Sequence, residues 1–122
     1  MDHEYEVAMR VDFARWQALL DSPFPIETEA ELEQRIHADE IELRWSYGPH
    51  SAHWRYLDDA HQDWAARPET MTRFLDGITQ DRTAGYFVGV TDIEYRSQCQ
   101  ARDLTEAERA RKRDRPPRQR GR

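Results

Sequence analysis

The sequence predicts an α+β fold: an antiparallel sheet of about four strands with helices packed on one face, most simply a ferredoxin-like sandwich. Three observations lead to this prediction. Apolar and polar residues alternate on both sides of a turn at 48–51, a pattern typical of a β-hairpin. Further alternating runs occur near both ends of the chain. Between these runs, apolar residues recur every three or four positions, as they do on one face of a helix.

The predicted hairpin covers residues 41–57. In its first half every second residue is apolar: Ile41, Leu43, Trp45 and Tyr47. Side chains on a strand point alternately to its two faces, so this spacing buries one face and leaves the other in water. The alternation resumes after the turn, at Ala52, Trp54 and Tyr56. A helix beginning near Ser51 is a competing interpretation, because Trp54 and Leu57 also have helical spacing.

The N-terminal part predicts one strand and two helices. Residues 4–11 alternate as a strand, with Tyr5, Val7, Met9 and Val11 on one face. Asp12 is a suitable N-cap for a following helix. That helix has an apolar stripe of Phe13, Trp16, Leu19 and Leu20.

The second helix is predicted from a capping box formed by Thr28 and Glu31, and it runs to about Asp39. Leu32 and Ile36 make up its apolar side.

The C-terminal half predicts two helices and a final strand. The first helix covers 58–66, and Pro68 suits the first turn of the second. The second has apolar residues at helical spacing: Met71, Phe74, Leu75 and Ile78. Residues 86–96 are predicted as the last strand, with Tyr86 and Phe87 on opposite faces. A short polar helix follows at 105–112.

Length and composition predict one acidic domain at 1–102, followed by the polar helix and a disordered Arg/Pro-rich tail within 103–122. No apolar run is long enough to span a bilayer. The single cysteine, Cys99, excludes an intramolecular disulfide and predicts the reducing cytoplasm as the location.

The net charge of −6 hides a strong asymmetry. Residues 109–122 carry eight of the 18 basic side chains and only one of the 24 acids. The remaining ten basic and 23 acidic residues give 1–108 a net charge of −13. An acidic body of this kind repels nucleic acid and attracts basic protein surfaces.

The sequence contains no catalytic or cofactor motif, so it predicts neither an enzyme nor a cofactor. His50, His53 and His61 lie near three aspartates, but their spacing matches no known metal site. We therefore expect surface histidines and no metal.

The candidate protein-binding residues are mainly acidic. One stripe comprises Glu27, Glu29, Glu31, Glu33, Asp39, Glu40 and Glu42, and a second comprises Asp58, Asp59 and Asp63. Arg44, His53 and Arg55 share the water-exposed face of the predicted hairpin with Glu42 and complete the set.

Three functional hypotheses follow. The first is a non-enzymatic module whose acidic surface docks on a basic, nucleic-acid-handling protein as an inhibitor or accessory factor. A phage or mobile-element inhibitor such as an anti-CRISPR protein is an example of that class. The second is a protein that binds nucleic-acid phosphates through its C-terminal cations. These are Arg109, Arg111, Lys112, Arg113, Arg115, Arg118, Arg120 and Arg122. The third is a small enzyme using His53 or His61 with an aspartate.

Overall fold

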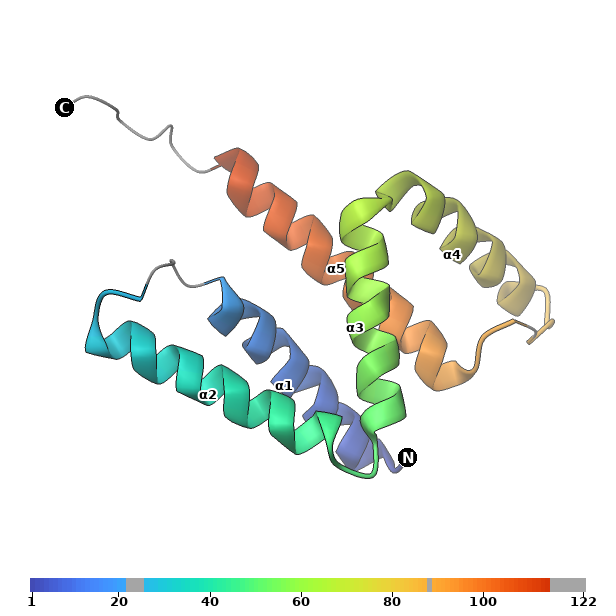
Figure 1. The fold of residues 1–122 in the computed structure, drawn as a ribbon. Coiled ribbons are helices and arrows are strands. Elements are labelled where there is room, and N and C mark those ends of the chain that lie inside the picture. The colour runs from blue at the N-terminus through green and yellow to red at the C-terminus, as the bar shows by residue number, and fades with distance from the viewer. Residues whose placement is uncertain (22–25, 88, 115–122) are drawn as a thin grey trace.

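The computed structural model describes residues 1–21, 26–87 and 89–114. Within these residues the chain forms five α-helices and no strand (Figure 1). They are α1 (His3–Leu20), α2 (Glu29–Ser46), α3 (Ser51–Ala66), α4 (Pro68–Thr83) and α5 (Asp92–Asp114). The predicted α+β class, with its four-stranded sheet and ferredoxin-like sandwich, is therefore wrong.

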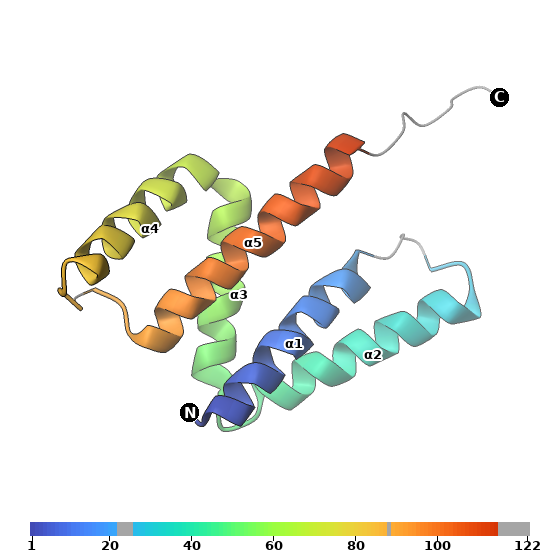
Figure 2. The same ribbon diagram turned by 180° about the vertical axis from the view of Figure 1, so that it is seen from behind.

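The helices are arranged around α3. α1 and α2 form an antiparallel hairpin, and α3 crosses from this hairpin to α5 and α4 (Figures 1 and 2). α3 packs against α2, α4 and most extensively α5, while α1 packs against α2 and α5. None of the helices in the described residues is both long and apolar enough to cross a membrane.

Aromatic side chains fill the core between α1, α2 and α3. The buried cluster consists of Met9, Phe13, Trp16, Ala38, Ile41, Trp45, Trp54 and Leu57. Trp54 contacts rings from both other helices: it lies edge-on to Phe13 at 5.3 Å and stacks on Trp45 at 5.9 Å. Geometries of these kinds are favoured by the quadrupoles of aromatic rings.

A second, smaller core joins α3, α4 and α5. It contains Ala60, Trp64, Met71, Leu75 and Ala101. The indole nitrogen of Trp64 donates a 2.8 Å hydrogen bond to the Gln98 side chain, which in turn donates to the hydroxyl of Tyr56 at 3.0 Å. The polar groups that α3 and α5 bury between them are thus satisfied, as buried polar groups must be.

The predicted strand at 4–11 is part of α1. Met9 is fully buried, but Tyr5, Val7 and Val11 of the predicted buried face are all exposed. The residues that α1 does bury are spaced three or four apart: Glu6, Met9, Phe13 and Trp16. The helical pattern was not visible in the sequence, because a charged residue, Glu6, occupies one of the buried positions of α1 where an apolar residue is expected.

The predicted hairpin is two helices joined by a short turn. Ile41 and Trp45 are buried, whereas Leu43 and Tyr47 are exposed by 56% and 83%. Residues four apart share a helix face, so this burial follows a helix and not a strand. On the other side of the turn, Trp54 and Leu57 are buried in α3, and the competing helical interpretation from Ser51 is confirmed.

Gly48 closes the turn between α2 and α3. A Cβ atom at this position would lie 2.6 Å from the carbonyl oxygen of Arg44, a contact that real Cβ atoms do not make. The glycine therefore marks a tight end of a helix, not the loop of a hairpin.

The predicted strand at 86–96 is also wrong. Tyr86 and Phe87 lie in the loop after α4 with about two thirds of their surface exposed, and the guanidinium of Arg82 covers the Phe87 ring at 5.1 Å. α5 begins at a capping box in which the Thr91 and Glu94 side chains each accept the other residue's backbone N–H. The predicted polar helix at 105–112 lies within α5, as does the proposed domain boundary at 102.

Five predicted helical segments lie within observed helices, including the one after Asp12 in α1 and the one at 105–112 in α5. The Thr28 and Glu31 capping box begins α2, which continues past the predicted end to Ser46. Residues 58–66 lie in α3, and Pro68 occupies the first turn of α4. In α4, Met71, Leu75 and Ile78 are buried, whereas Phe74, predicted on the same apolar face, is exposed by 42%.

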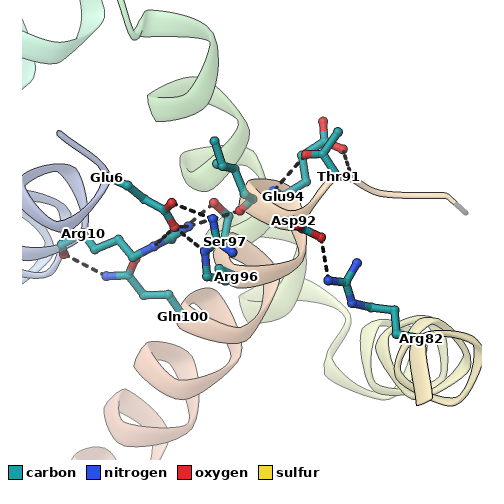
Figure 3. Close-up of polar contacts among 10 residues, drawn as sticks. Glu6, Arg10, Arg82, Thr91, Asp92, Glu94, Arg96, Ser97 and Gln100 are labelled. Carbon is teal, nitrogen blue, oxygen red and sulfur yellow. Dashed lines mark hydrogen bonds and ion pairs between the residues drawn. The ribbon is translucent and has the colours of Figure 1, made fainter. Parts of the chain in front are cut away.

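A buried carboxylate joins α1 to the start of α5 (Figure 3). Glu6 is only 5% exposed and accepts two hydrogen bonds from Arg96, at 2.6 and 2.7 Å, and two from Arg10, at 2.7 and 2.9 Å. Arg10 also donates to Ser97, to Gln100 and to the carbonyl of Ile93. Hydrogen bonds from Arg96 and Arg10 lower the pKa of Glu6 to about 2, against the opposing effect of burial.

Replacing Glu6 by Gln should destabilise the protein in a pH-dependent way. The pKa is about 2 in the folded state and ordinary, 4.5, in the unfolded state. The carboxylate thus contributes stability above pH 4.5 that is lost as the pH falls towards 2. We expect Glu6→Gln to lower the free energy of unfolding by roughly 2 to 3 kcal/mol at pH 7 and by less than half of that at pH 3.

Urea unfolding of both proteins at the two pH values measures this difference. Glu4→Gln is the matched control, because Glu4 is exposed in the same helical turn and should change stability little at either pH. A Glu6→Gln effect of equal size at pH 7 and pH 3 would contradict the assignment.

Candidate protein-binding surface

α2 has apolar side chains on two opposite faces. One face packs into the core through Ala38, Ile41 and Trp45. The other carries Leu32, Ile36, Leu43 and Tyr47, which are exposed by 47%, 48%, 56% and 83%. Leu43 lies two positions beyond Ile41, a rotation of about 200° around the helix, so the two sets point in opposite directions.

These four exposed residues form one stripe, here named the α2 outer stripe. They are separated by four, seven and four positions, spacings that return to the same side of a helix. Tyr47 is the C-cap residue and extends the stripe beyond the last turn. Single exposed apolar residues are ordinary, but a row of four along one side of a helix is typical of an interaction site.

Acidic side chains surround the α2 outer stripe. Glu33 and Glu40 are seven positions apart and follow one of its edges, while Glu42 lies towards the other edge. Asp39, seven positions after Leu32, lies between the apolar residues. All four carboxylates are exposed, and none takes part in an ion pair within the described residues.

The structure divides the predicted acidic stripe. Glu29 is exposed on the first turn of α2, close in rotation to Ile36. Glu31, in contrast, is used in the capping box. It accepts the N–H groups of Glu27 and Thr28, and the Glu27 hydrogen bond is the main cause of the lowered pKa of Glu31. Glu31 therefore serves the helix end and is not available to a partner.

Arg44 was predicted to lie on a water-exposed sheet face and instead connects two helices. Its guanidinium donates to Asp12 of α1 at 3.0 Å, and the same carboxylate oxygen accepts the indole N–H of Trp45 at 2.7 Å. Asp12, predicted as an N-cap, lies in the middle of α1 and joins α1 to α2.

The remaining predicted protein-binding residues lie on α3, apart from the α2 stripe. Arg55 and Asp59 are exposed, and His53 is half-buried. Asp63 is paired with Arg67 at 2.6 Å. Asp58 is half-buried, and burial raises its pKa. The predicted acidic residues of α3 are therefore only partly available to a partner.

The predicted basic arm begins inside the folded bundle. The Arg109 guanidinium donates to the backbone carbonyl of Trp64 near the end of α3, a contact that satisfies a free helix-terminal carbonyl. Arg111, Lys112 and Arg113 are exposed on the last turns of α5. Arg115, Arg118, Arg120 and Arg122 lie outside the described residues.

His61 is buried, so the prediction of a surface histidine is wrong at this position, and it pairs with Glu108 and not with an aspartate. Its Nε2 atom lies 3.2 Å from a Glu108 carboxylate oxygen, at the edge of an open cavity of about 240 Å³. Gln17, Asp21, Arg111 and Lys112 also line this cavity. No group of three or more His, Cys, Asp or Glu side chains in the described residues could hold a metal ion.

The α2 outer stripe was not predicted from the sequence, because all four of its residues were assigned to buried faces. Leu32 and Ile36 were predicted as the buried side of their helix, and Leu43 and Tyr47 as the buried face of a strand. The available signal was that α2 contains two apolar rows, of which a helix at the edge of a small bundle can bury only one.

Two matched substitutions distinguish the two faces of α2. Ile41→Ala should lower the free energy of unfolding by about 2 to 5 kcal/mol, because it leaves a cavity in the core. Leu43→Ala should change it by no more than about 0.5 kcal/mol, because the side chain is mostly in water. Chemical denaturation measures both. A Leu43→Ala cost close to that of Ile41→Ala would place Leu43 in the core and remove the stripe as a free surface.

Compared with known proteins, the chain matches no protein family, no curated protein sequence and no solved structure. Its function is therefore inferred from the surfaces described above.

Proposed function

We propose that this protein is a non-enzymatic interaction module that docks the α2 outer stripe and its acidic border onto a basic protein. The observation that carries the proposal is the combination on one helix of four exposed apolar side chains and a border of unpaired carboxylates. Recognition by one amphipathic helix laid in a groove is a recurring mode of protein binding.

The charges of α2 favour a basic partner over a second copy of this chain. Two copies packed through this face would bring Glu33, Asp39 and Glu40 towards the same residues of the other copy. Like charges placed opposite one another in an interface cost binding free energy. A groove with an apolar floor and a Lys- or Arg-rich rim would instead pair with both parts of the surface.

The apolar and acidic parts have different roles in this interaction. Leu43 and Tyr47 supply apolar area whose burial stabilises the complex, and tyrosine is among the residues most often dominant in interfaces. The carboxylates raise the rate of association and select the partner more than they add affinity. The negative charge of 1–108 extends this attraction over a longer range.

We place the partner among proteins that handle nucleic acid, because their binding grooves are lined with cations. An acidic module that occupies such a groove acts as an inhibitor or an accessory factor. The proposed compartment is the cytoplasm, because the chain's single cysteine suits a reducing environment.

A second candidate function is phosphate binding by the C-terminal cations. It is favoured by the exposed side chains of Arg111, Lys112 and Arg113 at the end of α5. Arg109 is excluded from this role because it is bonded to α3. A variant that tests the arm should therefore end at Asp114, so that α5 stays intact, and carry Arg111→Gln, Lys112→Gln and Arg113→Gln, because truncation alone retains these three cations.

Site-specific photo-crosslinking in the native host tests the first function. A benzoylphenylalanine at position 47 should capture a basic protein. The same probe at position 86 should capture none, although Tyr86 is a similarly exposed tyrosine. The captured protein is then purified and its affinity measured with variants.

The affinity measurements decide whether α2 is the docking surface. Leu43→Ala combined with Tyr47→Ala should weaken binding by about 30-fold or more, as expected for an interface centre. Glu33→Arg combined with Glu40→Arg should also weaken it, whereas Asp76→Arg with Glu106→Arg, the same charge change elsewhere, should not. If both charge-reversed proteins lost affinity equally, the loss would be explained by net charge and not by the position of the carboxylates on α2. This result would contradict the proposal.

Truncation after Asp114, combined with Arg111→Gln, Lys112→Gln and Arg113→Gln, separates the two functions. It should leave binding to the protein partner intact if α2 is the functional surface. If it abolishes capture, and capture by the full chain is removed by nuclease and falls steeply with salt, the phosphate-binding function replaces the docking function.

A further inference from the structure

A second cavity lies between α1 and the C-terminal end of α2, and it is distinct from the α2 outer stripe. This α1–α2 cleft is open to solvent and has a volume of about 290 Å³. Its lining is mostly apolar and includes Tyr5, Ala8, Trp45 and His50. The volume is at the lower limit of small-molecule sites, which suits a ligand of one ring system.

Aromatic rings form the walls of the cleft. The Tyr5 and His50 rings lie 4.9 Å apart, and His50 lies 6.3 Å from Trp45. Trp45 is fixed from behind, because it stacks on the buried Trp54. Planar rings stack well on such walls, which favours a flat aromatic ligand over an aliphatic one.

A carboxylate is placed at the same cavity. Asp12 lines the cleft, and its Oδ2 atom accepts the hydrogen bonds from both Trp45 and Arg44. The Asp12 side chain is still 21% exposed. A carboxylate has four acceptor positions, so Asp12 can accept a further hydrogen bond from a donor in the cleft.

The cleft is preformed. Gly48 and Pro49 line it, and backbone hydrogen bonds from Gly48 to Trp45 and from Ser51 to Gly48 fix the turn that carries them. The remaining walls belong to α1 and α2. Little of the protein therefore has to become ordered when a ligand binds, so the entropic cost of binding is small.

We infer that the α1–α2 cleft binds a planar aromatic ring that carries an ammonium group or another N–H donor, as in an arylalkylamine. The ring stacks against the aromatic wall of the cleft and the donor is held by Asp12. The negative charge of 1–108 attracts such a cation and repels the corresponding anion. This site does not depend on the proposed docking of α2.

Tryptamine and indole-3-propionate test the inference, because they share a ring system and carry opposite charges. In NMR titrations of the ¹⁵N-labelled full chain, the Trp45 indole N–H reports on the cleft. Tryptamine should shift this signal in a saturable manner. Indole-3-propionate should bind about tenfold more weakly or worse, because it forms no charge-assisted hydrogen bond with Asp12.

Two alanines of α1 provide a matched pair of variants. Ala8→Leu places a larger side chain in the cleft and should abolish the saturable shift. Ala18→Leu makes the same change at an exposed position of α1 that does not line the cleft, and it should leave tryptamine binding unchanged. Both variants should keep the circular dichroism spectrum of the unmodified chain, since neither alanine is buried.

Asp12→Asn tests the polar part of the site. The amide oxygen can still accept hydrogen bonds, but the charge is lost, so the preference for tryptamine over indole-3-propionate should fall to about threefold or less. The inference is overturned if tryptamine does not saturate the Trp45 signal, if Ala8→Leu binds as the unmodified chain does, or if indole-3-propionate binds more tightly than tryptamine.

Discussion

The contact of Trp54 with aromatic rings of α1 and α2 is the interaction on which the bundle depends. α3 packs against α2, α4 and α5 and so connects the α1–α2 hairpin to the other two helices (Figure 1). Trp54 makes three of the ring contacts between α3 and the hairpin. Phe13, Trp16 and Trp45 all have ring centroids within 6 Å of it. Aromatic side chains bury more area per residue than others, so a chain of 122 residues with a high charge content can still form a core.

This core also determines which surfaces remain free. Burial of Ile41 and Trp45 fixes the rotation of α2, and the same rotation turns Leu43 and Tyr47 to solvent. The exposed row is thus a consequence of the packing on the opposite face. The carboxylates along its border would repel those of a second copy, which is the basis of the proposed preference for a basic partner.

Buried polar contacts fix the positions of the helices relative to one another more specifically than apolar packing does. Glu6 with Arg10 and Arg96 fixes the start of α5 against α1, and Gln98 with Trp64 and Tyr56 fixes α5 against α3. A buried ion pair contributes little net stability, but breaking one is costly because the remaining charge has no water around it. Asp12 has the same role between α1 and α2, and there it also faces an open cleft.

The sequence by itself determined the elements with local signals: the capping box at Thr28, the start of α4 at Pro68 and the helical spacing from Met71 to Ile78. It also determined the charge asymmetry. Only the tertiary structure decided between strand and helix at 4–11, 41–47 and 86–96, because short runs such as Ile41, Leu43, Trp45 and Tyr47 fit both periods. It alone showed which row of α2 is exposed and that Glu6, Arg44 and Arg109 hold helices together, since these contacts join residues that are distant in the chain.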